Sequence, residues 1–226
     1  ILKKLENLSL SPSERASKET LARRLSIDIT GLPPEQEQII SFINSISENE
    51  YSSLIDTFLA TPTYGERMTQ VWLDVARYAD SHGYQDDNYR SMWPWRDWVI
   101  HAFNSNLSYD KFLTWQLAGD LLVNPTKEQI LATGFNRNHP ITQEGGIIQE
   151  EYRSAYDTDR TTTLGKGILG LTLECAKCHD HKYDDFSQKN YYEFYSFFNN
   201  VNEKGIQMTV PRASKLKYFA DDPYIT

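Results

Sequence analysis

The chain is predicted to be all-α, a single multi-helix domain with long loops, and three observations support this prediction. Apolar residues recur at helical spacing in successive segments, whereas the strict alternation typical of half-buried strands is nearly absent. Proline and glycine residues separate these segments. With 226 residues, of which 39% are hydrophobic and 13% aromatic, the composition allows one large domain or two small ones.

The predicted helices follow one another along the first half of the chain. Apolar stripes with the i, i+3, i+4, i+7 pattern occupy residues 39–46, 51–59, 68–79, 95–103 and 109–117. Proline-containing joints separate them at Gly31-Leu32-Pro33-Pro34, Thr61-Pro62, Trp93-Pro94, Asn124-Pro125 and His139-Pro140. Pro34 suits the first turn of a helix, so it is expected to open the helix that follows. All five tryptophans lie between positions 72 and 115, which favours a large aromatic core over a ligand-stacking wall.

The two cysteines of the chain stand three residues apart and are followed directly by a histidine, in Cys175-Ala176-Lys177-Cys178-His179. This spacing is typical of covalent haem attachment. Two thiols add to the vinyl groups of the porphyrin as thioethers, and the adjoining imidazole becomes an axial ligand of the iron. We therefore predict one covalently bound haem c near the C-terminal end, attached at Cys175 and Cys178, with His179 as the proximal ligand.

Zinc, a disulfide and a thiol redox site are the alternatives for this cysteine pair. A zinc site would have to recruit His179, His181 or a distant carboxylate, because the second Cys-x-x-Cys pair common in structural zinc sites is absent. A disulfide here would close a very short loop, and a thioredoxin-like site needs a βαβ context that the pattern lacks. The motif therefore favours haem.

The net charge and the distribution of apolar residues limit which partners the chain is expected to have. The formal net charge of −8, without a basic stripe, argues against nucleic acid and anionic membrane surfaces. No stretch approaches the ~20 apolar residues that a membrane span needs, so no membrane insertion of this segment is expected. A redox partner protein or an adjoining domain is the expected partner. Because haem c is attached outside the bacterial cytoplasm, we expect an exported, periplasmic or cell-surface protein whose signal segment is not in this chain.

Ordered motifs extend along nearly the whole chain. Those of the first half lie at residues 23–34, 64–67, 72–80, 96–100 and 116–120, and those of the second half at residues 132–135, 144–146, 150–151, 159–160 and 169–182. Together they resemble the planctomycete-type cytochrome c family, found in large exported proteins of Planctomycetes, Verrucomicrobia and related bacteria. The chain departs from the usual family pattern at Met68, Gln70 and Asp185, all outside the attachment motif.

The resemblance implies a cytochrome module at residues 1–205, with residues 206–226 beginning a linker to a further domain. It implies a haem-binding module embedded in a larger exported protein and supplies no reaction. Our first hypothesis is an electron-transfer domain rather than an enzyme, although the module could form part of an oxidoreductase. Two alternatives stay open. One is a haem-containing oxidoreductase module that acts on carbohydrate-related substrates, and the other is a non-catalytic binding or scaffold module.

The distal side of the haem has several candidate ligands. We favour His139, because it lies in a loop between predicted helices beside Glu144-Gly145-Gly146. His181 is too close in sequence to His179 to reach the opposite face of the same haem. The other distant candidates, besides an open iron position, are His82, His101, Met68, Met92 and Met208.

Two groups of charged residues have both a functional and a structural interpretation. Arginines that could bind haem propionates or form ordinary salt bridges are Arg77, Arg137, Arg153 and Arg160. Carboxylates that could bind calcium or support a helix start are Glu144, Glu150, Glu151, Asp157 and Asp159. For the carboxylates we favour the structural role, with Arg153 paired to Asp157 at i+4.

Overall fold

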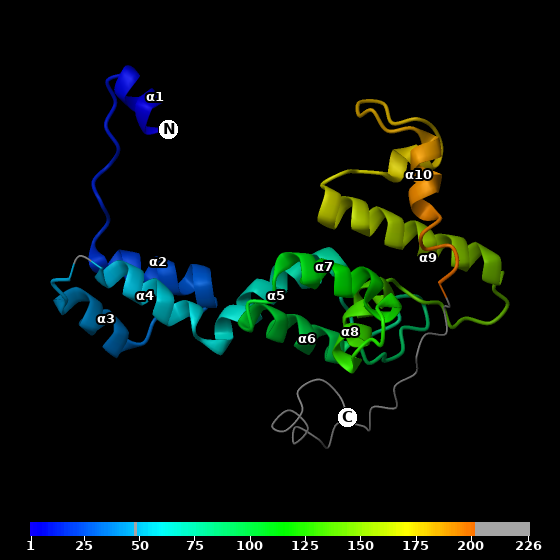
Figure 1. The fold of residues 1–226 in the computed structure, drawn as a ribbon, viewed down its shortest axis with the longest axis horizontal. Coiled ribbons are helices and arrows are strands. Elements are labelled where there is room, and N and C mark those ends of the chain that lie inside the picture. Colours follow the sequence, from blue (N-terminus) through cyan, green and yellow to red (C-terminus); the bar gives the residue numbers. More distant parts are fainter. Residues whose placement is uncertain (48, 202–226) are drawn as a thin grey trace, which may run out of the picture. The chain divides into compact units, whose positions relative to one another are not determined.

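A computed structural model describes residues 1–47 and 49–201 of the chain. Within these residues the regular structure is helical (Figure 1), and the only strand-like pairing is an isolated antiparallel bridge between Ser81 and Tyr89. The prediction of an all-α fold is confirmed for this part of the chain. The expected linker at residues 206–226 lies outside the described residues.

In its described residues the chain divides into two compact units, one within residues 1–67 and one within residues 68–201, where we expected a single domain. The physical reason is that the buried hydrophobic residues of each unit form a core of their own. The division falls inside the helix α5 (Pro62–Ala76), at the residue where the predicted apolar stripe 68–79 begins.

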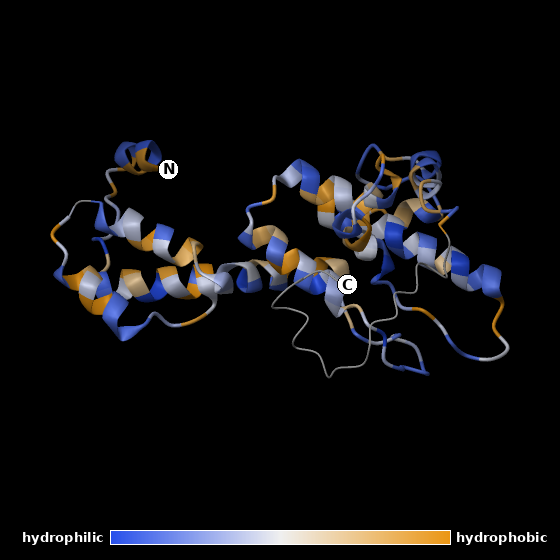
Figure 2. Ribbon diagram, turned by 60° about the horizontal axis from the view of Figure 1, so that its bottom comes forward, coloured by the Kyte–Doolittle hydropathy of each residue, from blue (hydrophilic) through white to orange (hydrophobic). Residues whose placement is uncertain are grey.

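The first unit is built around three amphipathic helices. Its elements are α1 (Leu2–Asn7), α2 (Lys18–Thr30), α3 (Gln36–Asn44), α4 (Glu50–Leu59) and the start of α5 (Pro62–Ala76). Ala22 on α2, Phe42 on α3, and Leu54 and Phe58 on α4 form its buried core. Figure 2 shows hydrophobic and hydrophilic residues alternating along these helices, as expected for amphipathic helices.

Local signals set the ends of these helices. Ser17 caps α2 by accepting a hydrogen bond from the Thr20 amide, and Gly31 ends it with φ of 74°, a left-handed conformation that glycine adopts without a steric penalty. Pro33 and Pro34 precede α3, which starts two residues later than expected because Glu35 forms its capping box.

The second unit contains the rest of α5 and nine further helical elements in the described residues. They are α6 (Trp93–Asn104), α7 (Tyr109–Ala118), η1 (Gly119–Leu121), α8 (Lys127–Ala132), η2 (Thr133–Arg137), α9 (Gln149–Leu164), η3 (Gly165–Leu169), η4 (Glu174–Lys177) and α10 (Gln188–Tyr195). Of these, η3 is a π-helix that continues directly from α9. No helix in the described ranges is long and apolar enough to cross a membrane.

An aromatic cluster on α5, α6 and α7 forms the main core of this unit. Trp95 and Trp98 are fully buried, and the Trp98 ring stacks on Phe112 with 5.6 Å between centroids. Trp72 packs against the same phenylalanine at 5.1 Å and donates its indole N–H to Gln116 Oε1 at 2.7 Å. The predicted aromatic core is confirmed, and each large ring adds both buried area and favourable ring geometry.

The end of α5 differs from the predicted stripe. The helix stops at Ala76 rather than near residue 79, because Arg77 takes a left-handed conformation with φ of 57°. The amide of the next residue, Tyr78, then donates to the Leu73 carbonyl at 3.0 Å. This bond closes a Schellman-type turn, in which glycine is the usual residue at the left-handed position.

Candidate functional site

The cysteine motif forms one tight turn in the second unit. Glu174–Lys177 is a short 3₁₀-helix, and the amides of Cys178 and His179 both lie 3.3 Å from the Cys175 carbonyl that accepts them. Because a 3₁₀-helix has three residues per turn, side chains at i and i+3 lie on the same side. Cys175 and Cys178 therefore project from the same side of the turn, and both are exposed free thiols.

A small hydrophobic cluster holds this turn in place. Ala176 and Tyr191 are fully buried and Leu173 is nearly so, and together they join η4 to α10. The Lys177 carbonyl accepts hydrogen bonds from Gln188 Nε2 at 3.1 Å and from the Tyr192 hydroxyl at 3.0 Å. The turn therefore buries Ala176, one of the two residues between the cysteines, and leaves both thiols toward solvent.

The exposed His179 has one ring nitrogen fixed by the backbone. Its Nδ1 lies 2.7 Å from the Asp180 carbonyl oxygen, which can only accept, so Nδ1 carries the proton. The lone pair is then on Nε2, which has no hydrogen-bond partner among the described residues. A metal-binding imidazole commonly donates its other N–H to a carbonyl in this way, which sets the tautomer and the ring orientation.

The loop after the motif is closed by its own hydrogen bonds. Asp180 Oδ1 accepts the Gln188 amide at 2.8 Å, and His181 Nδ1 accepts the Asp184 amide at 3.0 Å. The His181 amide donates to the Phe186 carbonyl at 2.8 Å. His181 is thus used to build the loop that follows the attachment motif.

The alternatives for the cysteine pair find little support in this geometry. Both thiols are free and exposed in the structure. In the part of the chain that the structure describes, no three His, Cys, Asp or Glu side chains gather as a metal-binding group. Structural zinc is normally held by four such ligands, which the surroundings of the pair do not offer.

His139 lies elsewhere in this unit and is fully buried. Its Nε2 is 2.6 Å from Arg160 Nη2, a group that can only donate, and its Nδ1 is 2.9 Å from the Pro140 carbonyl oxygen. The ring stacks on Tyr156 with 4.6 Å between centroids. Burial, together with the positive charge of Arg160, lowers the pKa of His139 to about 2.

This environment argues against the predicted role of His139 as a distal ligand. Both ring nitrogens are engaged by the protein, so neither offers a lone pair to iron. The sequence placed the residue in a loop between helices, which is correct, but it could not show that a fully buried arginine on α9 faces the ring. We therefore do not carry His139 into the proposed site.

A comparison with known families decides what kind of chain this is. The profile of PSCyt2, described as "Protein of unknown function (DUF1549)", matches residues 1–203. The chain belongs to the PSCyt2 family. The family name agrees with the resemblance to planctomycete-type cytochromes, and its description leaves the function unknown. Neither the curated proteins nor the solved structures include a match to the chain.

The charged residues of this PSCyt2 chain form salt bridges along α9. Arg160 Nη1 donates to Asp157 Oδ1 at 3.0 Å, and both side chains are buried. Arg153 pairs with Asp157 at 3.1 Å, which confirms the predicted i+4 pair, and also contacts Glu150. Glu150 and Glu151 lie in the first turn of α9, so the predicted structural role of this segment agrees with the structure.

Proposed function

We propose that this chain is a c-type cytochrome module that binds one haem covalently and passes electrons within a larger exported protein. Cys175 and Cys178 are the attachment residues and His179 is the proximal ligand. Haem, when bound, supplies one-electron redox chemistry. The single observation that carries the proposal is the Cys175–His179 turn, in which two free thiols lie on one side and the following imidazole keeps Nε2 available.

The thiols and the imidazole have separate tasks in this proposal. The two cysteine side chains tether the cofactor, and their separation of one 3₁₀ turn matches two attachment points on one edge of a planar ring. The Asp180 carbonyl holds the His179 ring by its Nδ1 proton. That bond also makes the imidazole a stronger electron donor through Nε2.

The surface near the turn suits a large planar apolar group. Tyr192 contacts the motif through the Lys177 carbonyl and is 45% exposed, and Tyr183 in the following loop is 83% exposed. Aromatic side chains carry large apolar area, and solvent exposure of that area is unfavourable. A haem that covers part of these rings would bury them.

The proposal includes a location and a partner. Covalent haem attachment requires an exported protein, so we place the chain in the periplasm or at the cell surface. The electron partner is a redox protein or an adjoining domain of the same polypeptide. The acidic net charge of −8 favours a basic contact surface on that partner.

A pyridine haemochrome spectrum tests the proposal on protein produced with a haem-attachment system. The parent chain is expected to give the spectrum of a haem with two thioether bonds. Cys175→Ala and Cys178→Ala each shift this spectrum toward one thioether bond, and the double variant retains no covalent haem. Parent protein without covalent haem under these conditions would rule the proposal out.

The proximal ligand needs a separate measurement. His179→Ala is expected to keep the thioether bonds and to change the ferric absorption spectrum, because the axial imidazole is lost. Val71→Ala is the control, since Val71 is 61% exposed on α5, lies outside the motif and cannot bind iron. Equal spectra for His179→Ala and the parent protein would exclude His179 as the ligand.

A further inference from the structure

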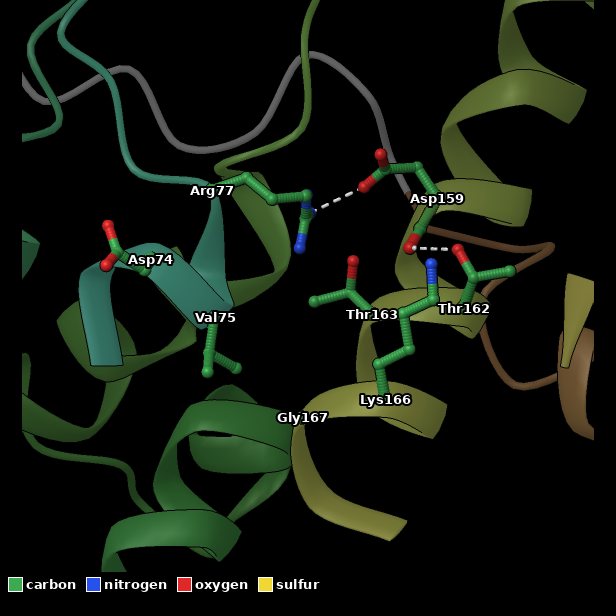
Figure 3. Close-up of a pocket in the computed structure, with 8 residues that line it drawn as sticks. All are labelled: Asp74, Val75, Arg77, Asp159, Thr162, Thr163, Lys166 and Gly167. Carbon is green, nitrogen blue, oxygen red and sulfur yellow. Dashed lines mark hydrogen bonds and ion pairs between the residues drawn. The ribbon is translucent and has the colours of Figure 1, made fainter. Parts of the chain in front are cut away.

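A pocket of about 360 Å³ opens between the end of α5 and the α9–η3 segment of the second unit. Figure 3 shows Arg77 reaching into it from one side, while Thr163 and Lys166 extend toward the same space from the other. The remaining lining residues are Asp74, Val75, Asp159, Thr162 and Gly167. None of these residues belongs to the Cys175–His179 turn.

The Arg77 guanidinium has more donors than the protein satisfies. Its Nη2 pairs with Asp159 Oδ1 at 2.5 Å. Its Nε and Nη1 are buried without a hydrogen-bond acceptor among the described residues. A buried donor of a charged group that lacks an acceptor is costly, and such groups in folded proteins call for an explanation. An acceptor brought by a ligand would supply the missing bonds.

Two unusual backbone conformations border the same pocket. Arg77 is a non-glycine residue at φ of 57°, which costs about 1–2 kcal/mol relative to a right-handed conformation. Lys166 and Gly167 lie on the π-helix η3, a rare form that is frequent at functional sites. A Cβ on Gly167 would lie 2.4 Å from Val75 Cγ1, so only glycine permits this close approach of η3 to α5.

The charged residues that line the pocket favour a ligand with a single negative charge. Arg77 and Lys166 are positive, whereas Asp74 and Asp159 are negative. Lys166 also pairs with Glu174, which lies directly before Cys175. A dianion would be repelled by the two aspartates, whereas a single carboxylate carries less charge and accepts a charge-assisted hydrogen bond from a guanidinium N–H. Val75 adds an apolar wall on which a short hydrocarbon chain can pack.

From these observations we propose that the pocket binds a monocarboxylate through Arg77, with the Thr163 hydroxyl as a second donor. The carboxylate has two possible sources, a free short-chain acid or a propionate side chain of a haem attached at the neighbouring motif. Only the second source rests on the proposed function. The carboxylate site itself stands on the pocket, the unpaired donors of Arg77 and the two backbone conformations.

Sodium propionate is the probe for this site. The 226-residue chain with Cys175→Ala and Cys178→Ala, which cannot attach haem, is titrated at constant ionic strength. The backbone amide signals of Thr163 and Gly167 are followed by NMR. We expect saturable shifts with propionate, and no such shifts with sodium phosphate at equal ionic strength. Absence of a saturable response to propionate would overturn the proposal.

Two substitutions in this chain locate the binding group. Arg77→Gln is expected to weaken propionate binding about tenfold or more, because a charged hydrogen-bond donor is lost. Arg96→Gln, which removes the same charge from an Arg–Asp pair on α6, leaves the affinity unchanged. If Arg77→Gln does not fold, the near-isosteric Thr163→Val decides, with an expected weakening of about threefold. Affinity equal to that of the parent in a folded Arg77→Gln or Thr163→Val protein contradicts the proposal.

The haem-loaded parent chain distinguishes the two sources. If added propionate no longer shifts the Thr163 and Gly167 signals, the carboxylate comes from the haem. If the shifts persist with the same affinity, the pocket binds a free acid. Failure to obtain haem-loaded protein contradicts the proposed function alone, because the titration of the cysteine-free chain is independent of haem.

Discussion

His179 and His139 show how the surroundings of one residue type decide its chemistry. The Nδ1 of each ring donates to a backbone carbonyl, at 2.7 Å in His179 and 2.9 Å in His139. They differ at Nε2. The exposed His179 keeps this nitrogen available, whereas buried Arg160 occupies that of His139. The histidine with the free nitrogen is the one that follows the cysteine pair.

The buried His139 predicts a pH dependence of stability. Its folded-state pKa of about 2 lies below the unfolded value near 6.5, so in this interval the unfolded chain binds a proton that the folded chain does not. The free energy of unfolding is therefore greatest above pH 6.5 and falls as the pH is lowered. The contribution of His139 is about 2–3 kcal/mol between pH 6.5 and pH 4.5.

Urea unfolding at these two pH values measures this contribution. Carboxylates add a pH dependence of their own, so the quantity of interest is the difference between the parent chain and His139→Gln. Glutamine retains a donor and an acceptor but does not titrate. The variant is expected to lose less stability on acidification than the parent. An identical loss in both proteins would show that His139 is not held neutral by the fold.

At the scale of elements, hydrophobic periodicity predicted five of the ten α-helices in the described residues, α3 to α7. The stripes at residues 39–46, 51–59, 95–103 and 109–117 coincide with α3, α4, α6 and α7 to within three residues at each end. Periodicity did not predict the end of α5, because the left-handed conformation of Arg77 has no regular sequence pattern. It did not predict the π-helix η3 either, because a local change in the backbone hydrogen-bond pattern leaves the spacing of apolar residues without a regular signal.

The candidate site was predictable only where its residues are neighbours in the chain. Cys175, Cys178 and His179 carry their spacing in the sequence, and the structure describes them as one turn. The pocket joins Arg77 to Thr163 and Lys166, which lie more than 80 positions away. The sequence singled out Arg77 as a possible carboxylate ligand, but it gave no reason to select the other two.

Close packing of α7 and α8 predicts a strong effect at Gly119. This residue has φ of −60°, so alanine meets no backbone penalty, but its Cβ would lie 2.0 Å from the Gln129 carbonyl oxygen. Gly119→Ala is expected to lower the free energy of unfolding by about 1–3 kcal/mol, because the two backbones must separate. Gly145→Ala is the control, since nothing lies within 4 Å of its Cβ. Equal stabilities of the two variants in urea unfolding would contradict this packing.

At the scale of the whole molecule, the two compact units have separate hydrophobic cores. Phe58 is 2% exposed and belongs to the core of the first unit, whereas Trp98 and Phe112 belong to the second. A cavity in one core removes contacts only from that core. Loss of stability from a core substitution should therefore be confined to the unit that contains it.

Phe58→Ala tests this division. Truncation of a buried phenylalanine typically costs about 3–5 kcal/mol. Amide hydrogen exchange, followed by mass spectrometry, should become faster by about 100-fold or more in α2, α3 and α4, and should be unchanged in α6 and α7. Leu59→Ala is the matched control, because Leu59 is 42% exposed. Faster exchange in all five helices of the Phe58 variant would show that the units share one cooperative core.

The proposed function has its own requirement at this scale. Haem must be attached at both cysteines, and in the folded chain the turn that carries them packs through Ala176 against Tyr191. The intact mass of the parent protein, produced with a haem-attachment system and extracted with acidified acetone, tests this requirement most directly. We predict a mass increase of one haem in the parent chain and none in the Cys175→Ala/Cys178→Ala variant. A parent chain at its unmodified mass, or the same increase in the double variant, would contradict covalent attachment at this site.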